Sequence, residues 1–334
     1  MKLDFGGKPM IPDRYNMENL RSTFNNPSVI CDEILRINRG LNRQMFGYKS
    51  SGGVNVLDRD WDTLIILDGC RYDIFEKNNG FEELAQPIVS QGAHSREFIQ
   101  KTFADKKLHD TVYITSNPWS EQLQEDTFFL KRETYTPEDK SGKARLPRDV
   151  SKLAIETFEE YPDKRYIVHF MQPNNPYVGP KAEQLRHDLL SEKNILCTEL
   201  NEETATDHAD LIDEVPNLRR ALKNGYITRS QMLEVYIENL EIVTQYAMDV
   251  IEELGGKTAV TADHGDMFGE RLPPLFLKDY SHWEGVYSES LRSVPWLVVD
   301  SENRREIRSE APLSQDSMED DAVREHLKSM GYLS

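Results

Sequence analysis

The sequence contains few cysteines and no long apolar run. Its three cysteines, Cys31, Cys70 and Cys197, are widely spaced and form no C-x-x-C pair, so neither a disulfide framework nor a thiolate zinc site is indicated. No stretch reaches the roughly 18 consecutive apolar residues of a membrane-spanning helix, and the first residues lack the apolar segment of a signal peptide. These absences predict a cytoplasmic protein without a transmembrane segment.

Positive charge is scarce as well. The chain of 334 residues has 40 lysines and arginines against 58 aspartates and glutamates, which gives a formal net charge of −18. Nucleic acid is therefore not expected as a partner, because phosphate backbones require a basic surface. An acidic enzyme that acts on an anionic substrate needs a local source of positive charge, and a bound metal ion supplies one. The sequence does not indicate an oligomeric state.

Five short apolar runs, each ending in a polar cluster, occur from residue 61 onward and are predicted to be buried strands followed by loops. Their sequences are WDTLIILDG, DTVYITSNP, RYIVHFMQP, KTAVTADHGD and SVPWLVVD. Helical patterns occur among them at 148–161, 181–197, 207–223 and 229–254. Strands that alternate with helices predict an α/β fold with a mostly parallel sheet, in which ligands bind beyond the carboxyl ends of the strands.

Residues 1–60 are predicted to form an N-terminal extension to a catalytic domain at 61–334. Five apolar residues of the extension recur at helical spacing: Ile30, Ile34, Ile37, Leu41 and Met45. Such an amphipathic helix could lie on a membrane surface or pack on the domain, and packing is favoured because Gly40 interrupts the helix. Within the domain, the charged segment 121–147 is predicted to be a surface excursion, and 301–320 an exposed connection to a terminal helix.

Two segments carry candidate metal ligands. TADHGDMFGER, at 261–271, places Asp263 and His264 side by side at the end of a predicted strand. A carboxylate oxygen and an imidazole nitrogen suit a divalent cation such as Zn²⁺ or Mn²⁺, although an aspartate at this point could instead cap a helix. Asp68 ends the strand in LIILDGCRYD, where a buried carboxylate needs either a metal or the nearby Arg71 as its partner.

Three further segments contain residues with reactive side chains. Ser95 follows His94 in SQGAHSREF, and its hydroxyl becomes a useful nucleophile only when a base or a metal lowers its pKa; otherwise the serine simply starts a helix. His169 lies within a predicted strand that leads to Asn174, and His282 lies in YSHWEG. Each segment alone is a weak signal, whereas their order along the chain is specific.

Taken together, these segments resemble the sulfatase-like branch of the alkaline phosphatase superfamily. That branch begins with a strand and a D-x-[LC]-R-x-D element, matched at 68–73, and contains a T-A-D-H-G-[DE]-x-x-G-E element, matched at 261–270. It then has a histidine before a leucine-arginine-valine-proline strand, similar to His282 and the LRSVP that follows. The phrase SMGYL near the C-terminus is similar to the end of the branch's terminal helix.

The resemblance implies a large mixed, mostly parallel sheet between helical layers. It also implies that Asp68, Asp263 and His264 are metal ligands, and that Ser95 is the nucleophile that the metal ionises. His169 and His282 would lie nearby as contacts to the substrate or to a second metal ion.

The sequence departs from the branch at several points. Cys70 is followed by Arg-Tyr-Asp and Ser95 by Arg-Glu-Phe, so neither matches the motif that is converted to formylglycine, and ordinary sulfatase activity is not expected. Asn174 stands where many relatives have a histidine, and an amide donates hydrogen bonds but binds zinc poorly. No clear D-x-x-x-H pair is found for a complete second metal site, so one ion (Mn, Zn, or Ca/Mg) is expected rather than two. Members of the branch usually work outside the cell or at a membrane.

The sequence therefore predicts a metal-dependent hydrolase that cleaves phosphate esters, and sulfate esters less readily, through Ser95. The substrate is expected to be a small molecule or a glycan- or lipid-linked ester, contacted by Arg71, His169 and Asn174. His282 would protonate the leaving group if its pKa is near neutrality, while Arg71 could equally form a structural ion pair. Two alternatives remain open: transfer of the phospho-group to a sugar or lipid alcohol, and a non-catalytic binding protein with the same fold.

Overall fold

A seven-stranded mixed sheet forms the centre of the computed structural model, which describes residues 27–50, 52–134, 146–200 and 211–313. The strand order is β2-β11-β8-β1-β5-β3-β4. The strands of this sheet are β1 (Thr63–Leu67), β2 (Gln86–Val89), β3 (Leu108–Thr115), β4 (Phe128–Glu133), β5 (Arg165–Phe170), β8 (Thr258–Thr261) and β11 (Ser293–Val299). Strands β8, β1, β5, β3 and β4 are parallel, and β11 runs antiparallel to β2 and β8. The predicted α/β fold with a mixed, mostly parallel sheet is confirmed.

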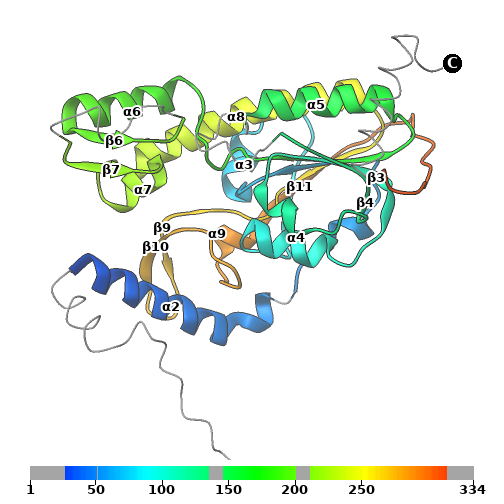
Figure 1. Ribbon diagram of the computed structural model, residues 1–334. Coiled ribbons are helices and arrows are strands. Elements are labelled where there is room, and N and C mark those ends of the chain that lie inside the picture. Colours follow the sequence, from blue (N-terminus) through cyan, green and yellow to red (C-terminus); the bar gives the residue numbers. More distant parts are fainter. Residues whose placement is uncertain (1–26, 51, 135–145, 201–210, 314–334) are drawn as a thin grey trace, which may run out of the picture.

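Helices cover both faces of this sheet (Figure 1). The helices are α2 (Pro27–Ser50), α3 (Tyr72–Asn78), α4 (Ser95–Phe103), α5 (Pro147–Glu160), α6 (Pro180–Lys193), α7 (Leu218–Lys223), α8 (Arg229–Leu254) and α9 (Glu289–Arg292), with short 3₁₀ turns η2 (Val56–Asp58) and η3 (Pro118–Gln122). Ile65 and Leu67 of β1 pack in one core with α5 and α8, whereas Leu64 and Ile66 pack in another with α4. The alternation follows from the period-2 geometry of a strand, and it explains why β1 is apolar throughout.

The register of the parallel strands brings several polar residues to one edge of the sheet. Ile66 pairs with Thr261 of β8 and with His169 of β5, and His169 also pairs with Thr115 of β3. The residues that follow these positions therefore emerge together at the carboxyl edge. They are Asp68, Asp263, Asn174 and Asn117.

A small unit extends from the N-terminal part of α8. Helices α6 and α7 enclose a two-stranded sheet of β6 (Ile195–Cys197) and β7 (Asp213–Val215) with its own core. The predicted helix at 181–197 therefore ends at Lys193. The prediction of a helix over 207–223 is wrong for residues 211–217, which contain β7, paired with β6. Of the described part of this range only α7 is helical, and residues 207–210 lie outside the described residues.

The prediction of a surface excursion at 121–147 is wrong for β4, which is a strand of the main sheet with Phe128, Phe129 and Leu130 buried. Residues 301–313 contain no helix or strand. They nevertheless pack on the domain, where Arg304 forms ion pairs with Asp60 and Asp62. The predicted terminal helix lies outside the described residues.

The predicted amphipathic helix is observed as α2, which continues through Gly40 without a break. It lies against a hairpin of β9 (Met267–Leu272) and β10 (Leu277–Ser281), on the side of the molecule away from α5 and α8 (Figure 1). None of the helices in the described part of the chain is long and apolar enough to cross a membrane.

Candidate metal centre

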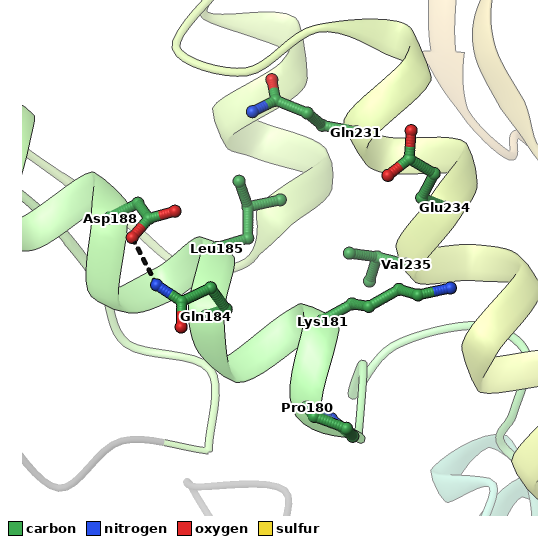
Figure 2. Close-up of a pocket in the computed structure, with 8 residues that line it drawn as sticks. All are labelled: Pro180, Lys181, Gln184, Leu185, Asp188, Gln231, Glu234 and Val235. Atoms are coloured by element: carbon green, nitrogen blue, oxygen red, sulfur yellow. Dashed lines mark hydrogen bonds between the residues drawn. The ribbon is translucent and has the colours of Figure 1, made fainter.

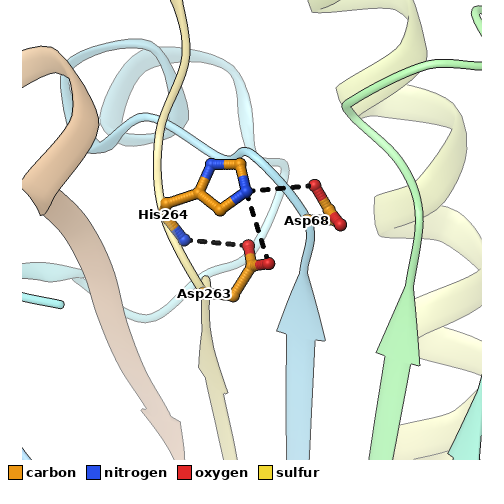
Figure 3. Close-up of side chains that lie close together, drawn as sticks. All are labelled: Asp68, Asp263 and His264. Atoms are coloured by element: carbon orange, nitrogen blue, oxygen red, sulfur yellow. Dashed lines mark hydrogen bonds and ion pairs between the residues drawn. The ribbon is translucent and has the colours of Figure 1, made fainter. Parts of the chain in front are cut away.

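Three candidate ligands converge where β1 and β8 end. Asp68, Asp263 and His264 are all buried, and each offers one ligand atom within 4.8 Å of the other two (Figure 3). The His264 Nε2 atom lies 3.6 Å from Asp68 Oδ1 and 3.5 Å from Asp263 Oδ2. These separations are long for hydrogen bonds, but two atoms that each bind one ion at about 2 Å lie about 3–4 Å apart. The predicted convergence of the three side chains is confirmed.

The backbone fixes the orientation of Asp263. Its Oδ1 atom accepts hydrogen bonds from the amides of Gly69 (3.0 Å) and His264 (2.8 Å). Gly69 follows Asp68 in a left-handed conformation, with a φ of 69° that a residue with a side chain rarely adopts. Asp263 Oδ2 is thereby turned toward the other candidate ligands, and the turn after β1 delivers an N–H to the carboxylate of the neighbouring strand.

Two buried atoms of the site have no hydrogen-bond partner among the described residues: Asp263 Oδ2 and His169 Nε2, which lie 3.7 Å apart. On the other side of the ring, His169 Nδ1 lies 2.9 Å from the hydroxyl of Tyr113. Buried polar atoms are usually paired. A divalent cation that binds the Asp263 oxygen would satisfy the first of them, so the donor set fits a metal.

The charges of the cluster also fit a cation. Burial raises the pKa of Asp68, and the nearby Asp263 carboxylate raises it further. Burial also acts to raise the pKa of Asp263, but His264 and His169 outweigh it and hold that pKa well below its usual range. For His264, burial acts to lower the pKa, and the two carboxylates more than reverse this. Two carboxylates in one dry site repel each other, and a bound cation would offset the repulsion.

Ser95 lies directly at the cluster. Its Oγ donates a hydrogen bond to Asp68 Oδ2 (2.9 Å) and lies 3.1 Å from His264 Nε2. It is the first residue of α4, whose start is capped by the His94 side chain, which accepts from the Arg96 amide. The N-terminus of a helix favours negative charge. The serine thus combines a position next to the candidate ligands with a local field that suits an anion.

Two amides hold Asp68 from the remaining sides. Asn117 donates to Asp68 Oδ2 and Asn174 to Asp68 Oδ1, both at 2.7 Å. Asn174 therefore contacts a candidate ligand rather than the open part of the site. The predicted contact of Asn174 with substrate remains a prediction, and the amide is placed to fix the orientation of the carboxylate.

A buried ion pair that the sequence analysis missed adjoins the cluster. Arg219 of α7 pairs with Asp266 and donates to the side-chain oxygens of Asn174 (3.1 Å) and Asn175. The arginine lies in a short helix without a motif, so only the fold connects it to the site. Asp266 lies within the TADHGD segment, and that position was the one available signal for this network.

His282 is placed between this network and the candidate ligands. Its ring lies 4.4 Å from that of His264, and its Nδ1 atom lies 3.2 Å from Arg219 Nη1. Burial, together with the nearby His264, lowers the pKa of His282 to about 4. The ring is therefore neutral near pH 7. The same Nδ1 atom also lies 3.5 Å from Asp266 Oδ1, so this side of the ring faces both a donor and a carboxylate.

Arg71, by contrast, forms ion pairs with other side chains of the protein. Its guanidinium contacts Asp73 at 2.8 Å and Glu270 at 2.6 Å. A structural ion pair of Arg71 was the alternative that the sequence left open. The sequence did not name Glu270 as a partner. A direct contact of Arg71 with substrate remains a prediction.

Two surface cavities differ in their relation to the cluster. One of about 590 Å³ is lined by Arg96, Pro118, Trp119, Glu121 and Gln122, and the Trp119 ring lies 5.4 Å from that of His94, which is itself 5.0 Å from His282. A second cavity, of about 430 Å³, lies between α6 and α8 (Figure 2) and includes none of the candidate ligands. The first cavity is therefore connected to the site through Trp119 and His94, and its lining also includes none of the candidate ligands.

The chain has similarity to solved structures of known proteins. No family model and no curated protein sequence matches the chain. Solved structures that match include the integral membrane protein lipooligosaccharide phosphoethanolamine transferase A from Neisseria meningitidis, at 12% identity and a TM-score of 0.41 over 85% of this chain. The chain spans 58% of the length of that protein.

Two other matching structures have similarly low identity. The C-terminal periplasmic domain of EptC from Escherichia coli, in complex with Zn, matches at 13% identity and a TM-score of 0.46, over 75% of this chain and 76% of that one. A protein in the alkaline phosphatase superfamily from Vibrio parahaemolyticus matches at 13% identity and a TM-score of 0.39, over 80% of this chain and 70% of that one.

These comparisons correct one prediction. The cytoplasmic location inferred from the missing apolar segment is contradicted, because the matching structures include an integral membrane protein and a periplasmic domain. A leader or an anchor can lie outside the sequence in hand, so the absence of such a segment was a poor guide to location. The chain is similar to structures of the alkaline phosphatase superfamily, which is the resemblance that its motifs predicted.

Proposed function

We propose that this chain is a metal-dependent enzyme that cleaves phosphate esters through a covalent phospho-serine at Ser95. The observation that supports it most is the position of Ser95 Oγ, 2.9 Å from Asp68 Oδ2 and 3.1 Å from His264 Nε2. A serine with only a structural role at a helix start does not need two buried, ionisable side chains next to its hydroxyl. Asp68, Asp263 and His264 would hold the ion.

When bound, a divalent cation lowers the pKa of a nearby hydroxyl and offsets the charge of an anionic substrate. The chain's own residues do the rest. Asp68 accepts the hydrogen bond of the Ser95 hydroxyl, so the lone pairs of Ser95 Oγ point away from Asp68. Asn117 and Asn174 hold that carboxylate in place. The bond from Ser95 Oγ to phosphorus forms as the bond from phosphorus to the ester oxygen breaks. The Ser95 proton passes to the Asp68 carboxylate that accepts its hydrogen bond, and from there to the departing alkoxide.

The departing alcohol needs a proton. Neutral His282 carries one ring proton beside His264, and with that proton on Nε2 it can donate a hydrogen bond to the leaving oxygen. Water then attacks the phospho-serine, which releases phosphate and restores the Ser95 hydroxyl.

Transfer to an alcohol is the second candidate function. The cavity of about 590 Å³ beside Trp119 and His94 supports it, since it offers room for an acceptor next to the site. Both reactions use the same phospho-serine. Product analysis with and without added glycerol separates them: free phosphate alone indicates hydrolysis, and glycerol phosphate indicates transfer.

The test is to trap the intermediate. Incubation with an aryl phosphate ester, an acid quench and peptide mass spectrometry should find one phosphoryl group on Ser95. Ser95→Ala should lower turnover by roughly 10³-fold or more while metal binding persists. Ser230→Ala, at an exposed serine on α8, is the matched control and should leave turnover unchanged. Full activity in Ser95→Ala would remove the serine from the mechanism.

A further inference from the structure

Helix α2 packs on the domain with its polar side. Among the described side chains of the helix, the buried ones are Asn38, Arg39 and Asn42. Asn38 donates to the carbonyl of Leu272 at 2.9 Å, and Arg39 forms an ion pair with buried Asp279 at 2.6 Å. This is the reverse of an ordinary surface helix, which turns its apolar side to the core. The helix packs on the domain, as the sequence favoured, but with its polar side.

The apolar side of α2 is exposed instead. Ile34, Ile37, Leu41 and Met45 are between 36% and 53% exposed, and their spacing of three and four residues places them in one stripe along the helix. Asn38 lies beside this stripe and accepts from the amide of Leu275, in the turn of the β9–β10 hairpin.

That turn extends the stripe. Leu275 and Phe276 are 48% and 57% exposed. Among the described residues, six of the ten exposed large apolar side chains therefore belong to α2 and the adjacent turn. We call these six residues, Ile34, Ile37, Leu41, Met45, Leu275 and Phe276, the apolar stripe. A concentration of this kind marks an interaction surface rather than scattered surface residues.

We propose that the apolar stripe docks this protein on the surface of a lipid bilayer that contains anionic lipids. The charge of α2 favours this partner. Arg36 pairs with Glu33, Arg39 with buried Asp279, and Asp32 with Lys223. Arg43 and Lys49 remain as two positive charges of the helix in a chain with a net charge of −18.

The distribution of charge over the protein also determines which side would face the bilayer. Asp32 is paired with Lys223 of α7, and Arg43 and Lys49 are exposed. Anionic headgroups attract such cations over about a Debye length, whereas they repel the acidic remainder of the chain. A helix with an apolar stripe and basic flanks lies in the plane of the membrane interface.

The docking surface is attached to the loop that carries His282. Arg43 Nε donates to the carbonyl of Glu284 at 2.7 Å, and Asn42 exchanges hydrogen bonds with the carbonyl and the amide of Tyr287. Docking would therefore hold the candidate active site close to the bilayer, where a lipid-linked ester is available. This last step rests on the proposed function, whereas the docking itself does not.

Vesicle co-sedimentation of the full chain, without substrate, tests the docking. We expect the wild-type protein to sediment with vesicles of phosphatidylcholine and phosphatidylglycerol, and less with pure phosphatidylcholine. Ile37→Ser/Leu41→Ser removes apolar surface without changing charge, and should weaken binding by at least about tenfold. Leu84→Ser, at an apolar side chain 92% exposed outside the stripe, is the control and should bind like the wild type.

Three results would overturn the proposal. The first two are no vesicle binding by the wild-type protein and equal vesicle binding by the double variant. The third is light scattering that shows the wild-type protein to be a dimer and the double variant a monomer. The dimer would identify a second copy as the occupant of the stripe. Turnover of a soluble aryl phosphate is measured in parallel and should be equal in all three proteins. Turnover by a wild-type protein that does not bind vesicles would overturn the docking alone, and vesicle binding without turnover would overturn the proposed function alone.

Discussion

Replacing Arg219 with methionine would remove the cation that neutralises buried Asp266. The arginine is 7% exposed and Asp266 is fully buried, and the same guanidinium donates to Asn174 and Asn175. Removal of one partner of a buried pair leaves an uncompensated charge, which typically costs about 3–5 kcal/mol. We expect Arg219→Met to lower the free energy of unfolding by that amount.

A double-mutant cycle separates the ion pair from the other contacts. Asp266→Asn removes the charge, yet it keeps the oxygen that accepts from the Met267 amide. The double variant Arg219→Met/Asp266→Asn should recover part of the loss, with a coupling energy of about 1–3 kcal/mol. Its affinity for metal should stay below that of the wild type, because the contact to Asn174, and through it to Asp68, is still missing.

Urea denaturation followed by circular dichroism measures the stabilities. Arg220→Met, at the exposed neighbour on α7, is the matched control and should change the free energy of unfolding by no more than about 0.5 kcal/mol. Additive effects of the two single substitutions would refute the account of a coupled buried pair. A single Arg219→Met variant as stable as Arg220→Met would refute it as well.

Two further predictions concern substrate type and pH. Phosphate esters should be cleaved with a kcat/KM at least about tenfold above that of an aryl sulfate, because without formylglycine a sulfo-serine has no easy route to breakdown; a preference for sulfate in a side-by-side assay would contradict this. Burial raises the pKa of Glu199 from 4.5 to about 7, a difference of about 3 kcal/mol. Between these pH values the unfolded chain has lost the proton and the folded chain keeps it, so the free energy of unfolding falls as pH rises through this window. Glu199→Gln should abolish that fall in urea titrations at several pH values, and a parallel pH dependence in both proteins would disprove it.

The parts of the fold that the sequence predicted are those with local signals. The apolar runs of β1 and β8 predict buried strands, and α8 spans residues 229–254 as expected because Thr228 and Gln231 form a capping box at its start. Strand β4 was missed because it is an edge strand whose second half, Lys131–Glu133, is charged. Strands β6 and β7 have only three residues each, too few for a periodic pattern.

The residues of the candidate site likewise fall into those that the sequence predicted and those that it did not. Asp68, Asp263 and His264 follow strands, so their meeting at the carboxyl edge could be predicted from the strand pattern. Arg219 could not, because its relation to the site arises from the packing of α7 and not from its sequence neighbours. The orientation of α2 was also beyond the sequence: its polar side is buried because it bonds to backbone groups at Leu272 and Tyr287 that no apolar pattern reveals.

Metal binding by the purified protein tests the central claim most directly. Isothermal titration with Zn²⁺ and Mn²⁺ should show one high-affinity ion per chain. Asp263→Asn keeps the oxygen that accepts from Gly69 and His264 but loses the negative charge, and should weaken binding by roughly 100-fold or more. Asp300→Asn, at an exposed aspartate, should bind like the wild type. No ion bound by the wild-type protein, or equal affinity in Asp263→Asn, would contradict the metal centre proposed at Asp68, Asp263 and His264.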